Sequence, residues 1–177
     1  MTDSIAIGAD GQANHLLERL RATATEGALA SDVHFLPGLD LHADPLLGLG
    51  GTWRSPRGRL LELDARAAAP GGWCALHLAL PLATTRGKRV LGFAARLAAR
   101  EILVARACLR SSIEGGFVDC FFDKHLLFSA EEASHVDALH LELHEDIPQQ
   151  AAWRELILFL PPQSFRLSLI DWRVFAV

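Results

Sequence analysis

The chain has 177 residues, a length typical of one domain and sufficient to bury a core. Half of its residues are apolar and 21% are charged, so the composition is that of a globular protein and excludes a disordered chain. The formal net charge of −4 excludes a nucleic-acid binder that gains its affinity by neutralising phosphates.

The first predicted element is an amphipathic helix over residues 11–26. Leu16, Leu17 and Leu20 recur there at the spacing of one helical face. Asp10 stands at the position of an N-cap. We expect this helix to be the only long one and to form an arm that precedes the main domain.

The next segment, residues 31–58, is rich in glycine and proline, which indicates a loop-rich connection. From residue 59 onward apolar and polar residues alternate with a period of two, as in strands with one buried face. Turn signals such as Pro161-Pro162 separate these runs. Strands are predicted at residues 60–65, 73–81, 90–98, 103–110, 116–122, 137–145, 153–160 and 165–177.

About eight strands with no helix between them predict an all-β fold. We expect an antiparallel, jelly-roll-like β-sandwich with an N-terminal helical arm. The predicted division is a helical arm over residues 1–30, the loop-rich connection over 31–58 and the sandwich over 59–177.

The run HLELHE at residues 140–145 places two histidines and a glutamate at the close spacing of a possible zinc site. Its leucines alternate with His140, Glu142 and His144, which predicts a strand with the polar side chains facing outward. Two histidines four residues apart on a strand stand about 13 Å apart, too far to share one ion. A solvated face, a ligand-contacting face and a metal site that uses one histidine with Glu142 remain alternatives.

A second candidate lies in the loop-rich connection, where Asp40 and Asp44 flank Leu41-His42-Ala43. Their carboxylates, with backbone carbonyls, could hold a hard cation such as Ca²⁺. The run lacks the acidic density of a loop that forms a calcium cage alone. A turn in which both aspartates cap backbone groups is the alternative.

Several polar and aromatic side chains fall on the outward-facing positions of the predicted strands. If these strands share a sheet, one face carries an aromatic plate, arginine forks and histidines. Aromatic rings stack on the CH groups of sugars, and arginine pairs with hydroxyls or carboxylates in fixed geometry. The alternative is a merely solvated face. The residues are Trp73, His77, Arg96, Arg106, Arg110, His140, Glu142 and His144.

The cysteines are three in number and lie far apart, at Cys74, Cys108 and Cys120, without CxxC spacing. This pattern indicates buried, reduced thiols. No run reaches the roughly 20 apolar residues of a membrane span, and the N-terminus lacks the features of a secretory signal. We therefore expect a cytoplasmic protein with no membrane attachment.

The order of features in the second part of the chain carries a family resemblance. A strand at 73–81 ends at a proline-marked turn, a strand at 91–98 follows, Trp153 leads the penultimate strand, and residues 165–177 form a closing strand. In this order, residues 59–177 resemble the jelly-roll carbohydrate-binding modules and the galactose-binding-like domains. The resemblance implies a sugar ligand.

The same resemblance bears on a structural calcium ion. The closing strand of those families commonly carries an aspartate near a Ca²⁺ site, and Asp171 matches it. Asp40 or Asp44 would have to supply the rest of the site. The missing secretion signal departs from the families, whose members mostly act outside the cell.

The leading hypothesis is a non-catalytic domain that recognises a carbohydrate or sugar-like ligand on its polar sheet face. The runner-up is an assembly protein whose helix leucines dock on a partner or on a second copy. A third alternative is a metal-dependent enzyme of sandwich or cupin type that uses His140 and Glu142. No G-x-S-x-G nucleophile motif supports hydrolysis.

Overall fold

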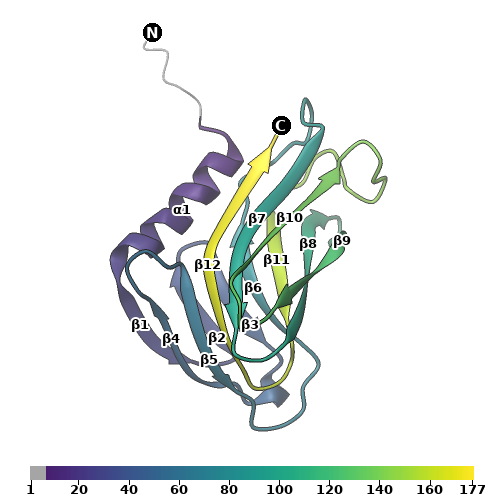
Figure 1. Cartoon of the computed structure of the whole chain (residues 1–177). Coiled ribbons are helices and arrows are strands. Elements are labelled where there is room, and N and C mark those ends of the chain that lie inside the picture. The colour runs from purple at the N-terminus through teal and green to yellow at the C-terminus, as the bar shows by residue number, and fades with distance from the viewer. Residues whose placement is uncertain (1–6) are drawn as a thin grey trace.

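The computed structural model describes residues 7–177, which form two six-stranded antiparallel sheets packed face to face and one α-helix, α1 (Ala9–Thr23) (Figure 1). Sheet A has the order β1 (Thr25–Leu29), β4 (Gly50–Ser55), β5 (Leu61–Arg66), β12 (Phe165–Ala176), β7 (Val90–Ala99), β10 (Ala133–His140). Sheet B has the order β2 (Asp32–Leu36), β3 (Leu39–Ala43), β6 (Cys74–Ala79), β11 (Arg154–Leu160), β8 (Leu103–Ile113), β9 (Gly116–Phe128).

This architecture confirms the predicted antiparallel β-sandwich with an N-terminal helix. The described residues form twelve strands, however, and not about eight. The predicted loop-rich connection, residues 31–58, contains β2, β3, β4 and the short 3-10 helix η1 (Pro45–Leu47). Its glycines predicted loops, but Gly38 and Gly48 lie in tight turns with positive φ that connect strands of only five or six residues.

The predicted strand over residues 137–145 is also wrong at its end. β10 ends at His140, which pairs with Val90, the first residue of β7. Leu141 still donates its N–H to the carbonyl of Arg89, and the chain then turns so that the backbone N–H of Leu143 donates to the carbonyl of His140. Leu143 is therefore 75% exposed, although the alternation predicts a core position.

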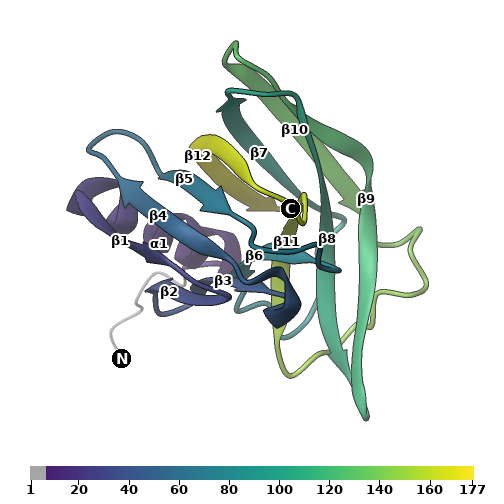
Figure 2. The same cartoon turned by 90° about the horizontal axis from the view of Figure 1, so that it is seen from below.

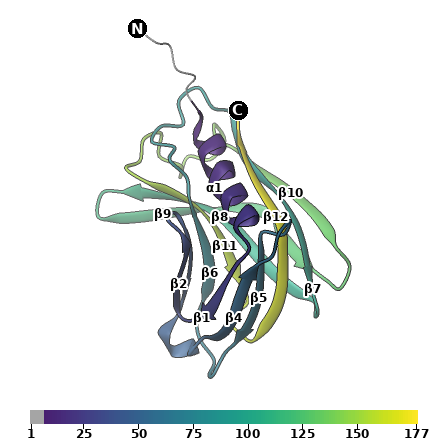
Figure 3. The ribbon, with the colours of Figure 1, turned by 90° about the vertical axis from the view of Figure 1, so that its left-hand side faces the viewer.

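The helix α1 begins at Ala9 and ends at Thr23, with Gly8, and not Asp10, as the N-cap. It lies across the gap between the two sheets (Figure 3). Leu17 and Leu20 are 1% and 0% exposed in the common core, so the helix is part of the sandwich and not a separate arm.

An asparagine fixes the helix to sheet A. β5 pairs with β12 only as far as Leu169, which leaves the C-terminal half of β12 with one free edge. The Asn14 amide donates to the carbonyl of Val174 and accepts from its N–H, both at 2.8 Å. Asn14 thus satisfies the backbone groups that a neighbouring strand would otherwise pair.

The side of the sandwich away from α1 is closed by β9 and β10, which lie side by side where the two sheets meet (Figure 2). The buried carboxylate of Asp137 accepts a hydrogen bond from the backbone N–H of Lys124 at 2.8 Å. The Lys124 ammonium donates to the carbonyl of Val136 at 2.9 Å. The sandwich therefore leaves the outer faces of its two sheets as its broad free surfaces. No helix within residues 7–177 has the length and apolar character needed to cross a membrane.

Candidate ligand-binding face

The outer face of sheet B is built from alternate residues of six strands, which the pairing register arranges in rows across the sheet. The first two rows run from β2 to β9, and the third runs from β6 to β9. The first row is Asp32, His42, Ala75, Phe159, Arg106 and His125; the second is His34, Asp40, His77, Ile157, Cys108 and Phe121; the third is Ala79, Glu155, Arg110 and Asp119.

The centre of this face is apolar and closely packed. Ala75, Ile157 and Cys108 are fully buried although they point away from the main core. Phe121 and Phe159 pack against them, with ring centroids 5.9 Å apart in a stacked arrangement. Burial raises the pKa of the Cys108 thiol, so this cysteine is a packing group and not a nucleophile.

The β8–β9 half of the face carries two arginines held over phenylalanine rings. The Arg106 guanidinium lies 4.2 Å from the Phe121 ring centroid, and that of Arg110 lies 3.8 Å from the Phe117 centroid. Arg110 also donates to both carboxylate oxygens of Asp119, at 2.6 and 2.7 Å. Arg106 makes no ion pair with a described residue, so its charge stays available to a ligand.

The β2–β3 part of the face alternates histidines with carboxylates. Nδ1 of His34 lies 2.6 Å from Asp40, and Nδ1 of His42 lies 2.9 Å from Asp32. The hydrogen bond with Asp40 raises the pKa of His34 above its ordinary value. These pairs fix the orientation of groups that could bind hydroxyls.

His77 and Glu155 continue this polar strip onto β6 and β11. Nδ1 of His77 lies 2.9 Å from Glu155, and the His77 ring meets that of His42 edge to face with centroids 4.8 Å apart. The hydrogen bond with His77 lowers the pKa of Glu155, and this effect outweighs the partial burial of the carboxylate, which raises the pKa. Glu155 is therefore a fixed carboxylate acceptor.

The structure brings together three of the eight predicted ligand-binding residues, namely His77, Arg106 and Arg110. Trp73 immediately precedes β6, at one end of the sheet, and its side chain is 42% exposed. Sequence reasoning missed Phe121, since alternation alone does not tell which strands are neighbours.

The other four predicted residues lie elsewhere. Arg96 belongs to β7 of sheet A, where it pairs with Glu132 at 2.6 Å. His140 ends β10 of the same sheet, and Glu142 and His144 follow it in a turn. The expectation that they share one face with Arg106 and Arg110 is therefore wrong, because the two groups of strands belong to different sheets.

The three aspartates predicted to hold calcium are separated and otherwise engaged. Asp40 pairs with His34, whereas Asp171 pairs with Arg21 at 3.2 Å and with Arg173 at 3.1 Å. Asp44 caps η1 and accepts the N–H of Leu46 and of Gly72, which lowers its pKa. The calcium expectation is thus not supported. Over residues 7–177 no group of three or more His, Cys, Asp or Glu side chains is placed to hold a metal ion, so the metal-site alternative at His140 and Glu142 gains no support.

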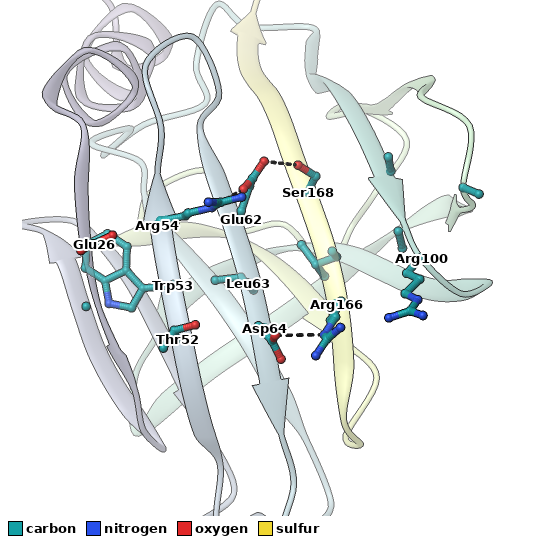
Figure 4. A pocket seen from close by; sticks show the side chains of 15 residues that line it. Glu26, Thr52, Trp53, Arg54, Glu62, Leu63, Asp64, Arg100, Arg166 and Ser168 are labelled. Carbon is teal, nitrogen blue, oxygen red and sulfur yellow. Dashed lines mark hydrogen bonds and ion pairs between the residues drawn. The ribbon is translucent and has the colours of Figure 1, made fainter.

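The outer face of sheet A carries a feature that the sequence did not indicate, an open groove of about 850 Å³ (Figure 4). Eight of its fifteen lining residues are charged or hydroxylated, and two ion pairs lie among them: Arg54 with Glu62 at 2.5 Å and Arg166 with Asp64 at 2.9 Å. Its polar lining comprises Glu26, Thr52, Arg54, Glu62, Asp64, Arg100, Arg166 and Ser168.

No protein-family model matches the chain, and no curated protein matches its sequence. Among solved structures, the chain is similar to the CBM22-1 xylan-binding domain of Paenibacillus barcinonensis Xyn10C. That likeness has a TM-score of 0.53 at 9% identity and covers 88% of both chains. A CBM4 structure gives 0.49 at 11% identity over 80% of this chain and 96% of that one. Endoglucanase 3 of Trichoderma harzianum, from family GH12, gives 0.49 at 9% identity over 88% and 99%.

The likeness to the xylan-binding domain shows the fold. The chain is a jelly-roll β-sandwich of the kind found in carbohydrate-binding modules, as the order of features in its sequence predicts.

Proposed function

We propose that the protein is a non-catalytic binding domain that recognises a carbohydrate or sugar-like ligand on the outer face of sheet B. The observation that carries the proposal is that one sheet face holds both Arg106 over Phe121, on β8 and β9, and the His77–Glu155 pair, on β6 and β11. Flat apolar surfaces and fixed, directional hydrogen-bonding groups alternate there within one sheet face.

A sugar ring offers the same two kinds of surface. Its CH groups favour contact with aromatic rings, and its hydroxyls both donate and accept hydrogen bonds. Arg110 and Glu155 are already held by Asp119 and His77, so little side-chain entropy is lost when a ligand binds. The planar guanidinium of Arg106 can bind two oxygens at once.

The carboxylates of this face support binding over glycoside hydrolysis. Hydrolysis requires a carboxylic acid with a raised pKa as proton donor, paired with a second carboxylate. The pKa of Glu155 is lowered by His77, and Asp119 is occupied by Arg110. Neither group fits the role of a general acid.

We also place the protein in the cytoplasm. The cysteines Cys74, Cys108 and Cys120 are free and buried in the structure. Free thiols in a folded domain fit a reducing compartment, whereas a small secreted domain more often pairs its cysteines.

The helix-mediated assembly that the sequence suggested lacks its predicted surface. Leu17 and Leu20 are buried in the chain's own core, and Leu16 is partly buried against it. A partner would have to unfold the sandwich to reach Leu17 and Leu20, and only Leu16 lines an open hollow. Docking through Leu17 and Leu20, as the sequence suggested, therefore has no support in the described structure.

The experiment that tests the proposal is a thermal-shift screen of neutral oligosaccharides, followed by calorimetry on any that bind. A ligand at one hundred times its Kd should add about 2.7 kcal/mol of stability, or about 5–10 °C for a domain of this size. Arg106→Ala should weaken binding about tenfold. Arg86→Ala, which removes an exposed arginine from the loop between β6 and β7, should leave it unchanged. A panel without any shift, or equal losses in both variants, would refute the proposal.

A further inference from the structure

A second hollow adjoins the groove on the outer face of sheet A, at the end where β5 finishes and β12 begins. It has a volume of about 410 Å³ and shares Asp64, Arg100 and Arg166 with the larger groove. Arg66 lines it as well. We call this smaller space the arginine hollow, after Arg66, Arg100 and Arg166.

Three separate segments supply these arginines. Arg66 is the last residue of β5, Arg166 the second residue of β12, and Arg100 directly follows β7. The backbone N–H of Arg100 donates to the carbonyl of Arg166 at 3.3 Å, which holds the two segments together. Figure 4 shows Arg166 beside Asp64, with Arg100 on the neighbouring segment.

The arginine hollow is unusual on this sheet because much of its positive charge is unpaired. Elsewhere around sheet A, arginines are matched with carboxylates: Arg54 with Glu62, Arg59 and Arg96 with Glu132, and Arg173 with Glu18. In the hollow only Arg166 is matched, by Asp64 at 2.9 Å. In the described part of the chain, Arg66 and Arg100 form no ion pair, and Glu101 is the one further carboxylate in the lining.

We propose that the arginine hollow binds an anionic group, a carboxylate or sulfate carried by an acidic oligosaccharide. Guanidinium groups bind such oxyanions through paired, charge-assisted hydrogen bonds. The adjoining groove would hold the neutral part of the same ligand, because it offers the hydroxyls of Thr52 and Ser168 and the fixed Arg54–Glu62 pair. The large apolar residues of that lining, Trp53, Leu63 and Leu167, belong to the buried core.

This site lies on the opposite face of the sandwich from Arg106, so the inference does not depend on sugar binding by sheet B. The two faces together would give the protein two ligand sites of different charge preference. Sheet B would take a neutral sugar surface, and sheet A an acidic one.

The test is calorimetry with galacturonate oligosaccharides, neutral galactose oligosaccharides of equal length, and polyglutamate. The test variant is Arg66→Ala/Arg100→Ala, and the matched control is Arg57→Ala/Arg86→Ala, which removes two exposed arginines outside both hollows. The unmodified chain should bind the acidic oligosaccharide more tightly than the neutral one. The test variant should lose at least about tenfold in that affinity, and the control should not. Raising the salt from about 20 to 300 mM should weaken the acidic ligand specifically.

Equal binding of the acidic and neutral oligosaccharides would overturn the inference, as would equal losses in the two double variants. Polyglutamate binding as tight as that of the oligosaccharide would overturn the assignment to a sugar. Arg106→Ala should leave the galacturonate affinity unchanged, so failure on sheet B and failure on sheet A are told apart. Because all four arginines are exposed, the variants should fold, and matched melting temperatures would verify this.

Discussion

Replacing Asn14 with alanine tests whether the attachment of α1 to β12 contributes to the stability of the sandwich. The side-chain amide forms two hydrogen bonds of 2.8 Å with the backbone of Val174, on the edge of β12 that β5 leaves uncovered. Val174 is 2% exposed, so water cannot readily replace the lost partner. Asn14→Ala therefore leaves one buried donor and one buried acceptor without partners.

The expected loss follows from these two groups. An unsatisfied buried polar group costs about 1–3 kcal/mol. Alanine gains about 0.5 kcal/mol in helix propensity over asparagine, which offsets a little of the loss. The net decrease in the free energy of unfolding should be about 2–4 kcal/mol, or about 4–16 °C in melting temperature for a chain of this length.

Urea unfolding followed by tryptophan fluorescence would measure this loss, with His15→Ala as the matched control. His15 is the next residue of α1, is exposed, and gains similar helix propensity on replacement. Asn14→Asp should fall between the two, because it keeps the acceptor for the Val174 N–H and loses the donor. A difference below about 0.5 kcal/mol between Asn14→Ala and His15→Ala would refute the reasoning.

Three further predictions concern core and site groups. Leu20→Ala should cost about 2–5 kcal/mol, because the side chain is fully buried; a change in oligomeric state without destabilisation would instead favour helix-mediated assembly. Burial raises the pKa of Cys74 to about 12, so a thiol reagent at pH 8 should label the unfolded but not the native protein. The lowered pKa of Glu155 gives stability that is present above its ordinary value of 4.5 and lost as the pH falls through the folded value. His77→Ala should therefore lower the stability above pH 4.5 and make it fall less steeply as the pH drops below that value, as urea melts between pH 3 and 6 would show.

The sequence allowed the fold to be predicted where strands were long and strictly alternating. β7, β8 and β12 have ten to twelve residues each, and most of their buried positions follow a period of two, interrupted at Cys108 in β8 and at the register shift between Leu169 and Asp171 in β12. β2 and β3 have five residues each and join through a turn at Pro37-Gly38. Their alternation was too short to predict strands against the loop signal of the surrounding glycines and prolines.

The site was predictable only in part, because alternation gives the face of a strand but not its neighbours. His77 and Arg110 reach the same face since β11 lies between β6 and β8, a register that depends on contacts far apart in sequence. His140 had the same alternation and lies in the other sheet. The strongest local signal that was missed is Asp32-Val-His34, paired across the hairpin with Asp40-Leu-His42.

The two outer faces achieve different chemistry within one rigid body. On sheet B, Arg110 and His77 are paired with carboxylates, and Phe121 stacks on Phe159 in the face that we propose as the ligand surface. On sheet A the groove is hydroxylated and charged, and its excess charge lies at Arg66 and Arg100. One common core joins the inner faces of both sheets, so the separation of the two faces is fixed by packing. With both proposed sites occupied, the domain would hold two unlike glycan segments at a constant distance, which a single binding face could not do.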